Sequence, residues 1–89
     1  MSETRVWLVE RSYSEEVQNM LELVYAVEDG GRKLHLQKML QTPRQADEVT
    51  AARDVDDGKL EPVRDEDERE RYRREVERMR ERYDADEAV

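Results

Sequence analysis

The chain contains one histidine, His35, and it is the first residue to consider for catalytic chemistry. Because cysteine is absent, a hydrolase triad, a general base or an imidazole metal site would have to use this side chain. Ser12 and Ser14 are possible nucleophiles, but no spacing links either of them to His35. We therefore expect His35 to be a solvated strand residue, and we expect a protein that is not an enzyme and uses no cofactor.

Acidic side chains could hold a metal ion, and the run of Asp54, Asp56 and Asp57 resembles half of a calcium-binding loop. The run lacks the glycine and the glutamate that continue an EF-hand loop. Aspartate and glutamate account for 24 of 89 residues, so paired carboxylates occur throughout and no pair is distinctive. We expect these acids to solvate the surface and no specific metal site to form.

A window without acidic residues, from 30 to 46, carries side chains that could contact an anion or RNA: Arg32, Lys33, His35, Lys38 and Arg44. Basic clusters of this kind bind phosphate groups, but RNA bases are usually stacked on aromatic side chains, which this window lacks. Glu22 and Glu28 of the preceding segment can also neutralise the same face. Weak RNA or anion binding is therefore the alternative functional hypothesis.

Composition narrows the class of protein. The chain has 16 basic and 24 acidic residues, giving a net charge of −8, which disfavours duplex DNA and anionic membranes as partners. No apolar run approaches the length of a signal peptide core or a membrane span. The absence of cysteine excludes disulfides, thiol enzymes and cysteine-based zinc sites. We expect a soluble cytoplasmic protein.

Arginine outnumbers lysine by 13 to 3, and the chain has no isoleucine or phenylalanine. This acidic, arginine-rich composition, the segment Thr-Arg-Val-Trp-Leu-Val-Glu-Arg at 4–11 and the closing run Arg-Tyr-Asp-Ala-Asp-Glu at 82–87 resemble the small uncharacterised proteins of haloarchaea. The resemblance implies a cytoplasm of high salt concentration and supplies neither an activity nor a catalytic residue. It also implies that salt stabilises the fold, because screening relieves repulsion among the excess acids.

Segment 4–11 is a β-branched and aromatic run with charged ends, which favours a strand. Segments 20–28 and 32–40 have the alternation of a half-buried strand. Glycines within 29–32 favour a tight hairpin between the last two segments. Placing this turn at 29–32 pairs residues whose numbers sum to 61, so Val27 lies opposite Leu34 and Glu28 opposite Lys33. We prefer this register to the sum of 59, which would place Leu21 beside Lys38.

The rest of the chain is predicted to contain two helices and one short strand. Thr42, Pro43 and Gln45 favour the start of a short helix over 43–53, and 59–63 is a candidate fourth strand that Pro62 confines to an edge. Residues 65–83 predict a long helix with one apolar stripe. We expect an α+β fold over 1–83, with a three-stranded and possibly four-stranded antiparallel sheet packed by the C-terminal helix, followed by a frayed acidic tail at 84–89.

If the long helix covers one face of the sheet, apolar side chains remain on the other face: Met20, Val24, Ala26 and Met39. Either the short helix at 43–53 or a second copy of the chain could cover them, and exposed apolar faces on small domains commonly mark association. The leading hypothesis is an interaction or structural module that forms a homodimer, or binds another protein, through this face.

Overall fold

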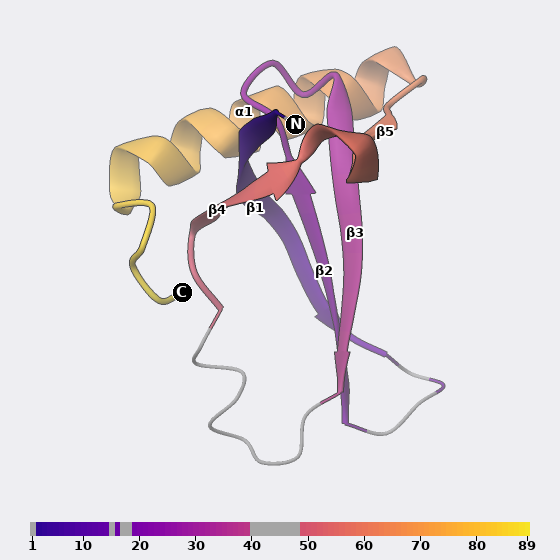
Figure 1. Ribbon diagram of the computed structural model, residues 1–89, viewed down its shortest axis with the longest axis vertical. Helices are drawn as coiled ribbons and strands as arrows, with labels where there is room; N and C mark the ends of the chain where they lie inside the picture. Colours follow the sequence, from indigo (N-terminus) through magenta and orange to yellow (C-terminus); the bar gives the residue numbers. More distant parts are fainter. Residues whose placement is uncertain (1, 15, 17–18, 40–48) are drawn as a thin grey trace.

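A computed structural model describes residues 2–14, 16, 19–39 and 49–89. Among these, five strands form one antiparallel sheet in the order β4-β1-β2-β3-β5, and one helix, α1, lies across the sheet (Figure 1). The elements are β1 (Glu3–Tyr13), β2 (Met20–Ala26), β3 (Arg32–Met39), β4 (Ala52–Asp56), the 3-10 turn η2 (Asp57–Lys59), β5 (Glu61–Pro62) and α1 (Glu66–Arg82). The α+β class is confirmed, with five strands where three or four were predicted.

The long C-terminal helix forms where the sequence predicts it. Asp65 caps its first turn by accepting a hydrogen bond from Asp67 N–H at 3.0 Å, and acids at the start with arginines at the end complement the helix dipole. Three residues of the predicted stripe are buried: Tyr72, Val76 and Met79. Burial of this narrow stripe against the sheet stabilises the helix beyond its local charge pairs.

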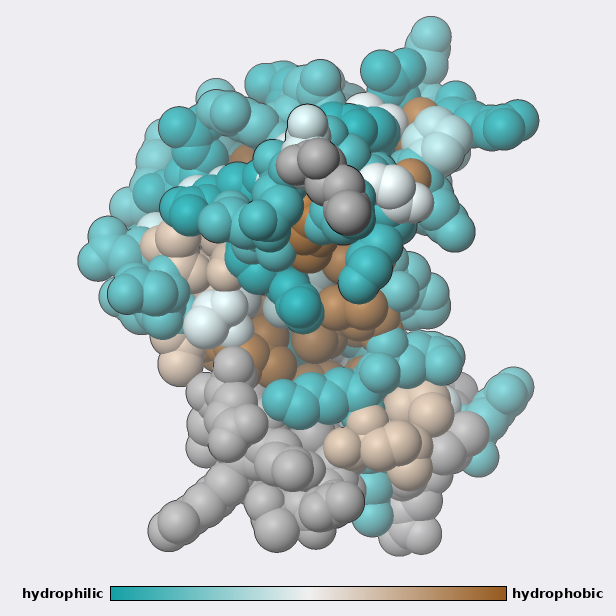
Figure 2. All heavy atoms as spheres, in the orientation of Figure 1, coloured by the Kyte–Doolittle hydropathy of each residue, from teal (hydrophilic) through white to brown (hydrophobic). Residues whose placement is uncertain are grey.

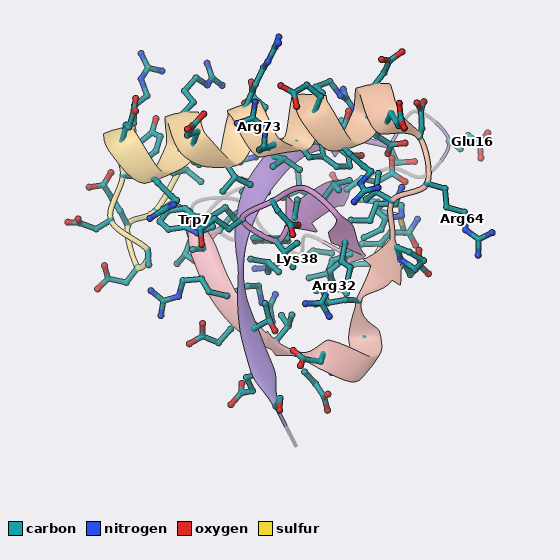
Figure 3. The ribbon with its side chains drawn as sticks, turned by 90° about the horizontal axis from the view of Figure 1, so that it is seen from above. Trp7, Glu16, Arg32, Lys38, Arg64 and Arg73 are labelled. Atoms are coloured by element: carbon teal, nitrogen blue, oxygen red, sulfur yellow. The ribbon has the colours of Figure 1, made fainter. Side chains whose placement is uncertain are left out.

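The helix covers the sheet face that we expected to be open. Val24 and Ala26 are buried, and they share an apolar cluster with Tyr72 and Val76 of α1. Figure 3 looks down the strands and shows α1 along one side of the sheet, with Trp7, which also packs against this cluster, on that side. The prediction that these residues of β2 point away from the helix is wrong, since alternation identifies two faces but not which one the helix covers.

The sheet face opposite α1 is covered by β4 and by the segment that precedes it. Leu21, Tyr25 and Leu34 belong to one buried cluster together with Val49, Ala51 and Val55, so β4 and the segment before it provide the cover. The predicted helix at 43–53 is wrong for residues 49–53, since Ala52–Asp56 is strand β4 paired with β1. The rest of that predicted helix, 43–48, lies outside the described residues, as does Arg44.

The acidic tail is hydrogen-bonded, in contrast to the expected fraying. Ala51 N–H donates to Glu87 O and Ala52 N–H to Ala85 O, each at 2.9 Å, while Val89 N–H donates to Val49 O at 2.9 Å. Figure 1 shows the tail, in yellow, beside the segment that leads into β4. The chain thus uses its own C-terminal residues to occupy backbone groups next to one edge strand.

The β2–β3 hairpin has the register that we rejected. Leu23 pairs with Leu36, and Leu21 pairs with Lys38, so the numbers of paired residues sum to 59. Both registers preserve the alternation of faces, and the turn selects between them: Gly30 has a φ of 74° and its N–H donates to Val27 O at 2.9 Å, while Asp29 Oδ1 accepts from Gly31 N–H at 2.7 Å. Residues 28–31 therefore form the loop, one position earlier than predicted.

Candidate interaction edge on β3

The outer edge of β3 has a strand partner over only part of its length in the described chain. β5 pairs with β3 at Arg32 and Lys33, and Val63 N–H donates to Gly31 O at 3.0 Å. On its other side, β3 pairs with β2 as far as Met39. β5 is short because η2 precedes it and the cap of α1, Asp65, follows it closely.

Backbone alternation decides which groups of β3 face outward. Val27 N–H donates to Arg32 O at 3.1 Å, so the even-numbered residues of β3 direct their N–H and C=O groups toward β2. The odd-numbered residues direct theirs away from β2, and three of them, His35, Gln37 and Met39, lie beyond the reach of β5. Within the residues that the structure describes, no backbone hydrogen bond occupies the outward groups of these three.

A groove lies beside this edge on the sheet face opposite α1. It has a volume of about 400 Å³, with Leu34 and Leu36 of β3 on one wall and Val55 of β4 on the other. Figure 2 views this face and shows hydrophobic residues in a hollow bordered by hydrophilic ones. The charged rim consists of Glu3, Arg53, Asp54, Asp56 and Lys59. Side chains of an added strand that alternate toward this face would meet the groove.

On the helix side of the edge, polar side chains of β3 and α1 form a small network. Lys33 Nζ lies 3.2 Å from Glu68 Oε1, and the Tyr72 hydroxyl donates to the same oxygen at 2.7 Å. These two hydrogen bonds hold the pKa of Glu68 below its usual value, with the Tyr72 bond the larger cause. Burial and the Glu68 carboxylate raise the pKa of Tyr72 to about 12. The network fixes α1 against β3.

The structure brings most of the predicted basic residues together on β3, but neighbouring acids offset them. Lys33 is paired with Glu68, and the hollow around Lys33 and His35 is also lined by Glu10 and Glu61. Arg32 lies in a different hollow, beside the hairpin turn, and Lys38 lies farther along β3. A phosphate backbone is bound by cations that lack such partners, so the geometry gives little support to the RNA or anion hypothesis.

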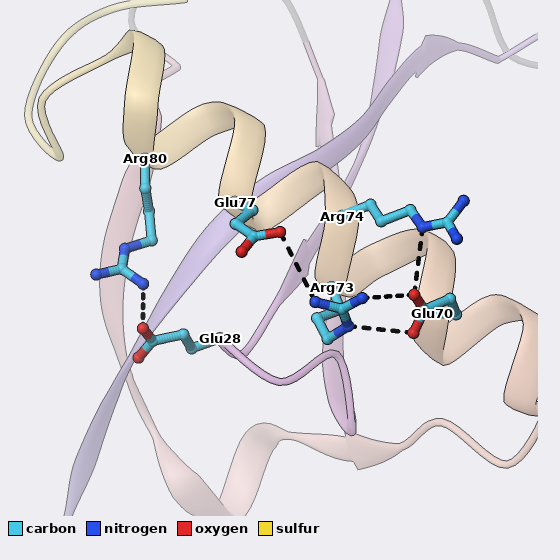
Figure 4. Close-up of polar contacts among 6 residues, drawn as sticks. All are labelled: Glu28, Glu70, Arg73, Arg74, Glu77 and Arg80. Carbon is cyan, nitrogen blue, oxygen red and sulfur yellow. Dashed lines mark hydrogen bonds and ion pairs between the residues drawn. The ribbon is translucent and has the colours of Figure 1, made fainter.

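Arginines of α1 are likewise neutralised by neighbouring glutamates (Figure 4). Arg73 lies 2.5 Å from Glu70 and 3.7 Å from Glu77, and Arg74 lies 3.2 Å from Glu70. Arg80 is paired with Glu28, in the loop between β2 and β3. The pKa of Arg73 is raised by its hydrogen bond to Glu70. This face of α1 is therefore a salt-bridged surface and not a basic arm.

The candidate catalytic and metal-binding residues are placed apart from one another. His35 lies on β3, whereas Ser12 lies on β1, two strand spacings away, or roughly 10 Å. In the acidic run, Asp54 pairs with Arg5 at 3.0 Å and Asp56 caps η2. Across the described ranges, no group of three or more His, Asp or Glu side chains is arranged to hold a metal ion.

The four residues predicted to form an oligomer interface are divided by the fold. Val24 and Ala26 lie under α1, Met20 is half-buried opposite Met39, and Met39 is 56% exposed. The chain itself therefore covers the predicted interface face, except at the end where Met39 lies. Sequence reasoning missed the outward backbone of Gln37. Pro62 predicted only that 59–63 lies at an edge of the sheet, and it did not indicate how much of β3 this strand would cover.

Comparison with known proteins identifies a family without assigning an activity. Residues 1–89 match the model of a family described as a family of unknown function, DUF7967. No curated protein and no solved structure matches the chain. No helix in the described part of the chain is long and apolar enough to cross a membrane.

Proposed function

The chain belongs to this family of unknown function, DUF7967, and we propose that it is a non-catalytic interaction module that receives an extended strand at the outer edge of β3. The observation that carries the proposal is the row of outward backbone groups at His35, Gln37 and Met39, which have no backbone partner among the described residues. In strand addition, such groups supply affinity through main-chain hydrogen bonds.

The surroundings of the edge support recognition of a strand. Leu34 and Leu36 line a groove on one face, and His35 lines a hollow beside α1 on the other. A strand laid along β3 would place alternate side chains over these two surfaces, which is how strand-accepting domains select sequences. Lys38 lies within the same edge, and an edge lysine restrains unselective aggregation.

The other edges of the sheet are partly occupied by the chain itself. The C-terminal tail hydrogen-bonds to residues 49–52 beside β4, and β5 covers the first residues of β3. Native proteins commonly block exposed strand edges. The outward backbone groups of His35, Gln37 and Met39 have no such partner among the described residues, which supports a role in binding.

The proposed setting is a cytoplasm of high salt concentration, as in haloarchaea. The net charge of −8 and the arginine preference support it, since screening by salt reduces repulsion within such a chain and between its copies. Binding through main-chain hydrogen bonds suits this setting, because these bonds depend less on salt than contacts between exposed charges do.

The proposal is tested with a displayed library of random peptides and two variants of one residue. Gln37→Pro removes an outward N–H without removing a hydrogen bond to β2, and proline is tolerated on an edge. Gln37→Ala is the matched control, since it loses the side-chain contact to Glu22 at 3.2 Å but keeps the N–H. Peptides selected on the wild type should bind Gln37→Ala with unchanged Kd and should bind Gln37→Pro at least 10-fold more weakly.

Two outcomes would refute strand addition at β3. The first is that the selected peptides bind wild type and Gln37→Pro equally well, and the second is that the library yields no peptide that binds the folded protein. Circular dichroism of both variants establishes that the comparison is made between folded proteins.

A further inference from the structure

The open stretch of β3 is bounded at both ends, which limits what can pair with it. β5 occupies the position opposite Lys33, and the strand ends at Met39. An added strand therefore has five residues, 35–39, with which to pair. From this length and the side chains along it, we infer that the occupant is the same stretch of β3 from a second copy, which rests on the function proposed above.

A two-fold axis at Gln37 gives the antiparallel register that uses the whole stretch. Gln37 then lies opposite its own copy and His35 lies opposite Met39 of the second copy, so that all three outward residues form hydrogen-bonded pairs, with about six bonds in total. A shift of two residues in one direction would place Met39 against the position that β5 occupies. A shift in the other direction would leave His35 without its opposite residue in the strand.

Side chains along the edge are compatible with this register. Leu36 would lie beside Lys38 of the second copy, whose aliphatic stem can cover it. Met39, which is 56% exposed, would be covered by His35 of the second copy. No two like charges lie directly opposite each other in this register.

Charge and contact area determine how strong the association can be. The window from 30 to 46 has no acidic residue, so pairing through β3 brings together the least negative parts of two chains whose net charge is −8 each. A contact of five residues per strand buries less surface area than the ~1,200 Å² that is typical of stable complexes. The dimer is therefore weak, and it strengthens as salt screens the remaining repulsion.

Cysteine pairs test the register, because the chain has no cysteine of its own. His35→Cys and Met39→Cys should each form little disulfide dimer alone, since like positions are roughly 13 Å apart along the strand. Mixed together under oxidising conditions, the two variants should cross-link, because opposite Cα atoms at about 5.5 Å fit a disulfide. Glu81→Cys, on the exposed side of α1, is the control for random collision.

Sedimentation equilibrium at high protein concentration and high salt completes the test. Wild type and Gln37→Ala should dimerise, and Gln37→Pro should lose at least 10-fold in association. A monomer at every concentration, with library peptides still bound at β3, would overturn the second copy and leave strand addition standing. A dimer unaffected by Gln37→Pro would overturn the inference. Cross-linking of the mixed His35→Cys and Met39→Cys variants no greater than that of Glu81→Cys would also overturn it. So would an RNA or an acidic peptide that occupies the edge in place of a second copy.

Discussion

Replacing Gly30 with alanine tests whether α1 packs on the hairpin turn as described. Gly30 has a φ of 74°, and a Cβ at this position would meet Arg69 O and lie 2.9 Å from Arg73 N, both in the helix backbone. A non-glycine residue with left-handed backbone costs ~1 to 2 kcal/mol, and overpacking adds ~1 to 3 kcal/mol. A lower entropy of the unfolded chain offsets ~0.4 to 1 kcal/mol. We therefore expect Gly30→Ala to lower the free energy of unfolding by about 2 to 4 kcal/mol.

Gly58→Ala is the matched control for this substitution. Its nearest neighbour is a side-chain oxygen of Asp56 at 3.5 Å, an ordinary contact, and its φ lies outside the left-handed region. Urea and thermal unfolding at constant salt should show Gly58→Ala within about 1 kcal/mol of wild type, whereas Gly30→Ala should lower the thermal midpoint by about 8 to 30 °C. Equal stabilities of the two variants would show that the turn does not contact the helix backbone.

Two further predictions concern solvent conditions. The thermal midpoint should rise as KCl increases from about 0.05 to 2 M, since the Debye length falls from over 10 Å to about 2 to 3 Å; a flat or falling midpoint would remove the proposal of a high-salt setting. Because the pKa of Tyr72 is raised from 10.0 to about 12, its neutral form is favoured in the folded state, and its contribution is complete below pH 10 and decreases as the pH rises toward 12. Urea titrations across that range should show a loss of about 2 to 3 kcal/mol that is absent in Tyr72→Phe; the same loss in both proteins would contradict the role assigned to this hydroxyl.

Strong local patterns explain what could be predicted from the sequence. The alternation in β2 and β3, the glycines between them and the cap at Asp65 each favour one local structure, and the fold contains all of them. Pro62 likewise indicated an edge strand at β5, and it lies in the outermost strand of the sheet. These signals arise within a few residues of the structure that they predict.

Long-range pairing explains what could not be predicted. The spacing of three between Val49, Ala52 and Val55 favours a helix, but pairing of β4 with β1 decided in favour of the strand. The tail at 84–89 has no local signal for order, yet it hydrogen-bonds to residues 49–52. The choice of the face under α1 depends on Ala26 and Val24, whose small side chains allow a close approach that alternation does not reveal.

The candidate site shows the same difference between what local patterns predict and what long-range contacts decide. Residue types predicted a basic strand at 32–40, and the structure places these side chains on β3. The acids that neutralise them, such as Glu68 and Glu61, come from segments about 30 residues away in the sequence. The open backbone at Gln37 depends on how far β5 extends, which is a property of the folded sheet and not of any motif.

Amide hydrogen exchange of β3 as a function of protein concentration tests the central claim most directly. In dilute protein, the amides of Leu34, Leu36 and Lys38 should be protected by β2, whereas those of His35, Gln37 and Met39 should exchange quickly. At high concentration in high salt, the second group should become protected and the first should change little. Protection of the odd-numbered amides in dilute monomer, or fast exchange of these amides at every concentration, would contradict an open edge that pairs with a second copy.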